Sequence, residues 1–310
     1  MIEKEAKLKM SRTLNRLAVA NARNGLFAVL KKKIRDNPNI QLLIPGYVGW
    51  SPNEGSGLMD PIQASAIDFQ FYSVTPELLP ITEELNKLLL GNKQAVLLLV
   101  HYFGNRSVLD ESTLSIIKEG GHGVIEDWAH DLSRFFEPRR TLSEDHYEIF
   151  SIHKWTSSRA GGLVRGNIRE LDPNDIEPAS LMDLEVLLST DIWEVYQARW
   201  SNFLRLDAEL VLTPVFHRLL SSLANLTCPI NYPIVLSSNA DRRDLYGYLV
   251  SKGLNPTALY HKLTDQLSRN DFPYAYTLAD QILNLPIHQD CTEDDTTSLV
   301  GAVNSWVQGR

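Results

Sequence analysis

Apolar runs alternate with amphipathic stretches along the first half of the chain. Residues 40–45, 68–72 and 94–100 are short apolar-rich runs bounded by polar residues, and this pattern predicts strands. Residues 82–90 and 109–119 carry apolar residues at helical spacing instead. Alternation of strand and helix is typical of βαβ units. It predicts a mainly parallel sheet with right-handed crossovers.

Two further runs end in residues that can do chemistry. The run 124–127 ends in Asp127, and the run 147–150 leads to Lys154 and then to a Gly161–Gly162 pair. Open parallel sheets bind ligands at the carboxyl ends of their strands. A lysine and a carboxylate at neighbouring strand ends can hold pyridoxal phosphate, because the amine bonds to the aldehyde and the carboxylate keeps the pyridine nitrogen protonated. Taken singly, an acid at a strand end is more often a cap or turn residue, and short motifs recur by chance.

The order and spacing of these residues resemble those of the DegT/DnrJ/StrS-type sugar aminotransferases. The matching segments are Glu-Asp-x-Ala-His at 126–130, Ser-x-His-Lys at 151–154 and the glycine pair that follows. The resemblance extends from about residue 12 to residue 308. It implies a pyridoxal phosphate-dependent transferase of fold type I, with Lys154 as the Schiff-base lysine and Asp127 as the partner of the pyridine nitrogen.

The same resemblance assigns further cofactor contacts. It implies that His130 forms a hydrogen bond near the ring hydroxyl and that Ser151 contacts the phosphate. A helix is expected to begin near Asn24, and helix N-termini suit phosphates. From the residues alone an N-cap and an exposed Arg23 is the simpler interpretation. The resemblance instead implies that the Arg23-Asn24 turn holds the phosphate.

The residue that lies against the cofactor ring is less well defined by the pattern. In the family, the turn after the strand at 40–45 supplies it. Alignment from Pro45 puts Gly49 at the usual aromatic position and Trp50 one residue later. Trp50 is therefore the candidate, with a core or interface role as the alternative.

The second half of the chain predicts a different organisation. Residues 171–178 are rich in Asp, Asn and Pro and suggest a linker, and residues 180–222 look helical throughout. This stretch contains an aromatic stripe, interpreted as core, and an Arg-x-x-Asn that resembles one on the family's connecting helix. A strand at 230–236 and later helices complete a smaller α+β region. We therefore expect a cofactor-binding large domain at 12–175, and the connecting helix with a small C-terminal domain at 176–310.

Composition narrows the class of protein. The 310 residues are 44% hydrophobic and 22% charged, which is typical of a globular protein. The formal charge of −8 argues against a nucleic-acid partner or an anionic membrane surface. Two scattered cysteines predict neither a disulfide framework nor a metal site. The charged N-terminus does not look like a signal peptide, so a cytoplasmic protein is expected.

By analogy with the family, the expected reaction moves an amino group from glutamate or glutamine to a keto-sugar nucleotide, within a homodimer. Two alternatives remain open. One is a dehydratase, in which a histidine replaces the lysine, and His153 stands beside Lys154. The other is a catalytically quiet subunit, since residues 163–190 contain no clear match to the loop by which partner subunits of the family share a site.

Overall fold

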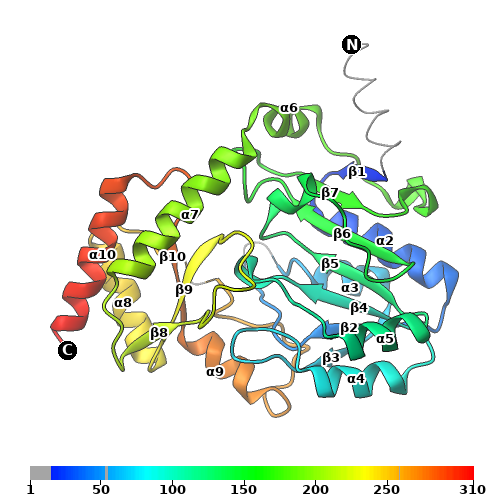
Figure 1. Cartoon of the computed structure of the whole chain (residues 1–310), viewed down its shortest axis with the longest axis horizontal. Helices are drawn as coiled ribbons and strands as arrows, with labels where there is room; N and C mark the ends of the chain where they lie inside the picture. Colours follow the sequence, from blue (N-terminus) through cyan, green and yellow to red (C-terminus); the bar gives the residue numbers. More distant parts are fainter. Residues whose placement is uncertain (1–14, 53–54, 258) are drawn as a thin grey trace.

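The computed structural model describes residues 15–52, 55–257 and 259–310. Within these ranges the larger sheet has seven strands in the order β1-β7-β6-β5-β4-β2-β3, on the right of Figure 1. They are β1 (Arg16–Val19), β2 (Gln41–Pro45), β3 (Asp68–Tyr72), β4 (Ala95–Val100), β5 (Gly123–Asp127), β6 (His146–Ser151) and β7 (Gly162–Arg165). Strands β2 to β6 pair in parallel, and β7 runs antiparallel to both of its neighbours, β6 and β1. The predicted α/β class with a mainly parallel sheet is confirmed.

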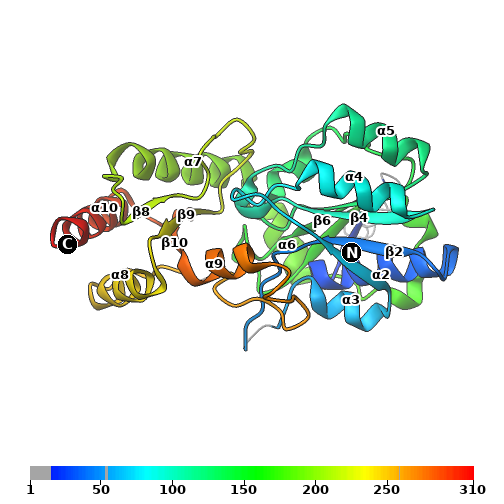
Figure 2. The same cartoon turned by 90° about the horizontal axis from the view of Figure 1, so that it is seen from below.

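Helices cover both faces of this sheet. In Figure 2, α4 and α5 lie on one face, and α2 and α3 lie on the other. Their bounds are α2 (Ala22–Asp36), α3 (Met59–Ser65), α4 (Thr82–Gly91) and α5 (Glu111–Glu119). Covering both faces explains why all six residues of β4 are buried, as its unbroken apolar run predicted. Helix α2 begins two residues earlier than expected, because the Asn21 side chain caps it by accepting the Asn24 N–H at 2.9 Å.

The register of the sheet brings the ends of its central strands together. Val100 of β4 pairs with Asp127 of β5, and Asp127 pairs with Ile149 of β6. The residues that leave β4, β5 and β6 therefore emerge at one edge of the sheet. This is the edge at which the sequence predicted a ligand site.

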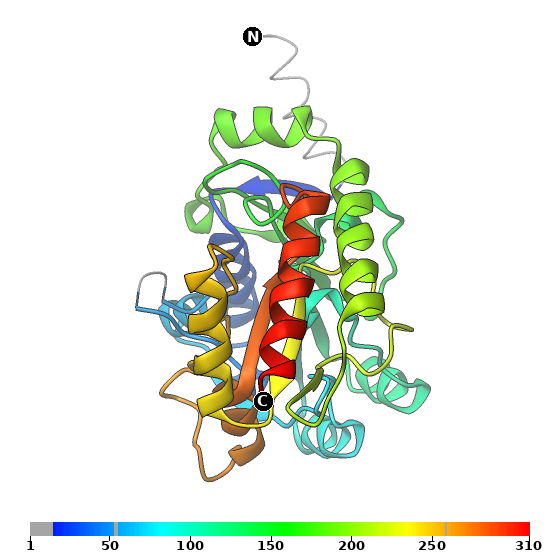
Figure 3. The same cartoon turned by 90° about the vertical axis from the view of Figure 1, so that its left-hand side faces the viewer.

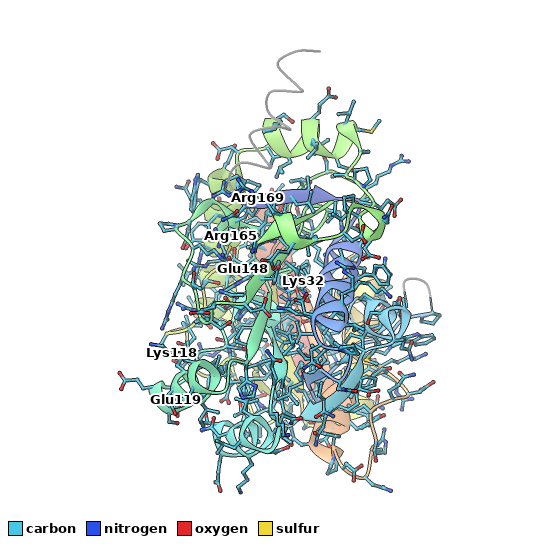
Figure 4. The ribbon with its side chains drawn as sticks, turned by 90° about the vertical axis from the view of Figure 1, so that its right-hand side faces the viewer. Lys32, Lys118, Glu119, Glu148, Arg165 and Arg169 are labelled. Atoms are coloured by element: carbon cyan, nitrogen blue, oxygen red, sulfur yellow. The ribbon has the colours of Figure 1, made fainter. Side chains whose placement is uncertain are left out.

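A buried ion pair joins β6 to the antiparallel strand β7. Arg165 donates from Nε to Glu148 Oε2 at 2.6 Å and from Nη2 to Oε1 at 2.7 Å. Its Nη1 donates to the carbonyl groups of Phe135 and Glu137. Figure 4 labels Glu148 and Arg165 where these strands meet, with Lys32 on α2 nearby. Because the guanidinium is bidentate and its remaining donor is satisfied, the pair fixes the register of β6 and β7, which flank the turn that contains Lys154 (the lysine turn).

The C-terminal part forms a second, three-stranded antiparallel sheet in the order β10-β9-β8. Figure 3 shows α7, α8 and α10 side by side in front of it. The elements are α6 (Leu181–Ser189), α7 (Ile192–Glu209), β8 (Phe216–Arg218), β9 (Asn231–Leu236), α8 (Asn239–Ser251), α9 (Pro273–Gln281), β10 (Ile282–Pro286) and α10 (Glu293–Gln308). Elsewhere in the described residues the chain forms four short 3₁₀ turns, η1 (Tyr102–Gly104), η2 (Leu132–Phe136), η3 (Ile168–Glu170) and η4 (Pro173–Asp175). The expected smaller α+β region is present.

One expectation for this region was wrong. The helical stretch does not continue to residue 222, because α7 ends at Glu209 and the chain enters β8. Pro214 cannot continue a helix, and Phe216–Arg218 pair with β9 instead. The aromatic stripe of α7 is only partly core, since Phe203 is buried while Trp193 is 48% exposed.

The C-terminal part touches the larger sheet at more than one place. Residues 177–179 run beside β1, where the Ala20 N–H donates to the Glu177 carbonyl at 2.7 Å. Residues 262–264 run beside residues 48–50 after β2. The division of the chain at residue 175 stays a prediction. Within the described ranges, every helix is too short or too polar to cross a membrane.

Candidate functional site

Asp127 lies at the carboxyl end of β5, half-buried, and its position is set by local main chain. Its Oδ1 accepts the Ala129 N–H at 2.8 Å, and its carbonyl accepts the His101 N–H at 3.2 Å. Burial raises the pKa of Asp127, and the Ala129 N–H and the Lys154 charge offset part of that rise. The carboxylate therefore stands in a place that favours a cationic partner.

Lys154 belongs to the turn that follows β6. The turn is closed by main-chain bonds from Ile152 to Gly161 at 3.0 Å and from Trp155 to Ile152 at 3.0 Å. Lys154 is half-buried, and its charge lowers the pKa of both Asp127 and His130. The amine of the turn thus acts on groups that emerge from the neighbouring strand.

His130 is buried behind Asp127. Its Nδ1 accepts the Phe103 N–H at 2.9 Å, so its proton sits on Nε2. Burial lowers the pKa of His130 well below its usual value, and the charges of Lys154 and Arg199 lower it further. His130 is therefore a neutral hydrogen-bonding group rather than a cation. Its contact with a ring hydroxyl stays a prediction.

The glycine pair brings the lysine turn against the start of α2. Gly161 has a φ of +95°, a conformation that side chains strongly disfavour. A Cβ on Gly162 would lie 2.4 Å from the Ala22 nitrogen. Ser151, buried at the end of β6, has its Oγ 3.0 Å from His153 Nδ1. The hydroxyl, the turn and the positive end of a helix thus adjoin, which suits a phosphate.

The other three predicted cofactor residues are Arg23, Asn24 and Trp50. Arg23 is 3.5 Å from Asp60 and half-exposed. The Asn24 side chain donates to the carbonyl of Asp175 at 3.3 Å and accepts the N–H of Glu177 at 2.9 Å, so it ties α2 to the segment beside β1. Trp50 is 43% exposed. Roles for these three residues stay predictions.

Arg199 of α7 contacts the main chain of the lysine turn. Its Nη2 donates to the Lys154 carbonyl at 2.6 Å and to Gln289 Oε1 at 3.1 Å. Its guanidinium lies 4.5 Å from the centre of the Trp155 ring, and the side chain is 2% exposed. Burial lowers the pKa of Arg199 to about 10. The Arg-x-x-Asn pattern was the only sequence signal for this contact between α7 and the lysine turn.

Tyr260 was not among the site residues predicted from the sequence. It comes from the loop between α8 and α9, yet its ring lies 5.7 Å from Phe103 and 6.1 Å from His130, measured between centroids. Burial and the charge of Asp127 both raise its pKa. No periodicity or motif marks this tyrosine, because it reaches the site only through the packing of the C-terminal part.

A second buried carboxylate lies one residue before Asp127. Glu126 is 3.0 Å from His101 Nε2 and 2.8 Å from His146 Nε2. The His101 ring stacks on Trp128, with 3.5 Å between centroids. No cluster of three or more metal-ligating side chains occurs within the described ranges, so this group is a hydrogen-bonded support rather than a metal centre.

The donor set fits pyridoxal phosphate. It offers a half-buried carboxylate for the pyridine nitrogen, an amine for the aldehyde, and a hydroxyl beside a helix N-terminus for the phosphate. The bulk that a Cβ would add at Gly162 shows how closely the lysine turn packs on that helix. The groups that the cofactor needs therefore converge at one edge of the sheet.

No family model matches the sequence, and no curated protein matches it either. Solved structures do match the fold. The sugar aminotransferase CalS13 from Micromonospora echinospora shares 16% identity, with a TM-score of 0.73 over 97% of this chain and 91% of that chain. PseC from Helicobacter pylori, an aminotransferase involved in the biosynthesis of pseudoaminic acid, shares 16%, with a TM-score of 0.73 over 95% and 87%.

A third similar structure is a DegT DnrJ EryC1 StrS aminotransferase from Brucella abortus, and this is the family that the sequence resembles. It shares 17% identity, with a TM-score of 0.73 over 96% of this chain and 88% of that chain. The resemblance stated from the sequence is confirmed in the fold, which is that of the fold type I transferases.

Proposed function

We propose that this chain is a pyridoxal phosphate-dependent aminotransferase that moves an amino group from glutamate or glutamine to a keto-sugar nucleotide. The observation that carries the proposal is that the adjacent parallel strands β5 and β6 deliver Asp127 and the turn with Lys154 to one edge of the sheet, where Gly162 packs on the start of α2. The similarity to CalS13, which is described as a sugar aminotransferase, supports the class of substrate.

Bound pyridoxal phosphate supplies an aldehyde and an electron-accepting ring. Asp127 holds a proton on the pyridine nitrogen, a cation that suits a carboxylate otherwise disfavoured by burial. Lys154 Nζ would hold the cofactor through its aldehyde. The same amine, once free of the cofactor, would act as the base that moves a proton at the α-carbon of the amino donor.

The remaining residues orient these groups. The Ser151 hydroxyl and the start of α2 receive the phosphate, and the N-terminal dipole of the helix favours its charge. Neutral His130 donates a hydrogen bond at the ring hydroxyl. Arg199 holds the Lys154 carbonyl and thereby fixes the turn from which the amine projects. A homodimer and a cytoplasmic location complete the proposal, and sedimentation velocity tests the oligomer.

The covalent site is tested by borohydride reduction of the full chain with pyridoxal phosphate, followed by peptide mapping. The pyridoxyl group is expected on Lys154 and absent from the Lys154→Ala variant. Lys252→Ala, on the exposed end of α8, is the matched control and should keep the label. A label on Lys252 or Lys262 in the wild type would overturn the site. No label at all would favour the quiet-subunit alternative.

The reaction type is tested with the amino donor alone. Glutamate or glutamine should bleach the absorbance of the lysine-bound cofactor and release the oxo acid. If no member of a broad amino-acid panel does so, the aminotransferase assignment fails. The dehydratase alternative would replace it if Lys154→Ala kept activity while His153→Ala lost it.

A further inference from the structure

Tyr260 lies in a loop of the C-terminal part that is held at both ends. On one side Thr257 exchanges main-chain hydrogen bonds with Asn284 of β10 at 2.9 and 3.0 Å. On the other side residues 262–264 pair with residues 48–50, which follow β2. The loop is therefore anchored to both sheets, and Tyr260 stands between the anchors.

The backbone of Tyr260 is held in an unusual conformation. Its φ is +64°, a region that residues other than glycine rarely adopt. The Tyr47 hydroxyl donates to the Tyr260 carbonyl at 3.3 Å. Neighbouring contacts thus hold the residue in a strained conformation, and strained residues cluster at ligand sites.

The ring of Tyr260 lies directly against Gly49. A Cβ built on Gly49 would be 2.6 Å from Tyr260 Cδ1 and 3.0 Å from Cε1, and the three nearest atoms all belong to this ring. The absence of a side chain at position 49 is what admits the tyrosine. The C-terminal part therefore places an aromatic ring on the turn that follows β2.

Three buried aromatic residues surround the ring. Its centroid is 5.5 Å from that of Tyr47, 5.6 Å from Tyr102 and 5.7 Å from Phe103. These three are at most 1% exposed, whereas Tyr260 is partly exposed. Tyr260 is thus the member of the cluster that a ligand at the strand ends can touch.

The same ring is close to the groups of the proposed site. Burial raises the pKa of the Tyr260 phenol, and the charge of Asp127 adds a smaller rise, so the hydroxyl stays protonated. The His130 ring meets it edge-on at 6.1 Å. Asp127, Lys154 and Tyr260 are all partly buried, and the charge of Asp127 acts on the Tyr260 phenol while the charge of Lys154 acts on Asp127.

We propose that Tyr260 forms the aromatic wall against which the pyridine ring of pyridoxal phosphate packs, so that the C-terminal part completes the cofactor site. The inference rests on the proposed function, because that function identifies the ligand. A flat heteroaromatic ring held at one end by a carboxylate gains from an aromatic neighbour. The half-exposed Trp50 is the competing aromatic.

Pyridoxal phosphate titrated into the full chain, followed by absorbance and by the circular dichroism of the bound cofactor, tests the proposal. Tyr260→Leu should weaken binding roughly threefold to tenfold and change the dichroism, since it removes one aromatic pair. Tyr260→Phe keeps the ring and should bind within about twofold of wild type. Tyr246→Leu, at an exposed tyrosine of α8, is the matched control.

A double-mutant cycle with Gly49 makes the test independent of folding defects. Gly49→Ala pushes the Tyr260 ring from its place and should weaken cofactor binding in the wild-type background. In the Tyr260→Ala background the same change meets no ring and should have no further effect. Additive effects of the two changes would contradict a shared ring position.

The outcomes separate this inference from the proposed function. If Tyr260→Leu binds the cofactor as wild type does, and with the same dichroism, the inference fails while the proposed function stands. Loss of affinity in Trp50→Leu alone would assign the ring contact to Trp50. A wild-type chain that takes up no pyridoxal phosphate at Lys154 would overturn both.

Discussion

Glu126 and Asp127 are adjacent carboxylates on one strand with opposite surroundings. Alternation along β5 sends their side chains to different faces of the sheet. Glu126 is 5% exposed and lies between two histidines. Asp127 ends the strand, half-buried, and its carboxylate accepts the Ala129 N–H. The comparison separates a carboxylate that supports the fold from the one proposed to hold a ligand.

Their titration differs in direction. Burial alone would raise the pKa of Glu126, but His101 and His146 lower it below its usual value. Burial raises the pKa of Asp127, since the groups around it offset only part of the cost. A buried charge whose desolvation cost is only partly offset by its neighbours indicates a candidate functional site. The difference supports the proposal that Asp127, rather than Glu126, is the carboxylate that pairs with a bound cation.

The largest effect is expected from removing the supported carboxylate. Glu126→Ala leaves the Nε2–H of His101 without its acceptor and opens a cavity, so the free energy of unfolding should fall by about 2–4 kcal/mol. Urea denaturation measures it. Asp68→Ala, at an exposed position of β3, is the control and should change stability by less than about 0.5 kcal/mol. An equally mild effect at Glu126 would erase the contrast between the two acids.

Asp127→Asn should separate binding from catalysis. The amide keeps the shape but cannot hold the pyridinium proton, so the variant binds the cofactor yet turns over at least roughly a hundredfold more slowly. Single-turnover kinetics with the amino donor measures this. Near-normal rates would show that Asp127 is only a strand-end acid.

The same variant should be more stable than wild type before the cofactor is added. The folded pKa of Asp127 is raised, so burying its charge costs stability above the unfolded pKa, and asparagine removes that cost. A gain of about 0.5–1 kcal/mol is expected at neutral pH. Thermal melts of the cofactor-free proteins check it, and a loss of stability would mean that Asp127 is already well compensated.

The smallest effects are changes in the slope of stability with pH, and they have opposite signs. Glu126 has a depressed folded pKa. It therefore contributes stability above about pH 4.3, its usual value, and that stability is lost as the pH falls toward the folded value. Glu126→Gln should flatten the acid limb. Asp127→Asn should steepen it, because the raised pKa of Asp127 favours the folded state at low pH. If stability fell with the same slope in acid for both variants, the contrast between Glu126 and Asp127 would be contradicted.

Much of the larger sheet could be predicted because its signals are local. The bounds of β3 match the predicted run at 68–72, and β4 and β5 followed from unbroken apolar runs. Asp127 and Lys154 stood out because strand ends are where parallel sheets bind ligands. Strands β1 and β7 were not predicted. They are short, and their pairing is antiparallel at the edge of the sheet, so register rather than composition defines them.

The sequence by itself determined the α/β class and the order of the central elements, and it singled out Asp127 and Lys154, the two residues proposed to carry the chemistry. Periodicity, caps and strand ends act over a few residues, and a single chain displays them directly. Only the tertiary structure decided that Arg199 supports the lysine turn and that Tyr260 enters the site. The bond between Tyr47 and Tyr260 joins residues 213 positions apart, and no local pattern encodes such a contact, because packing of the two sheets creates it.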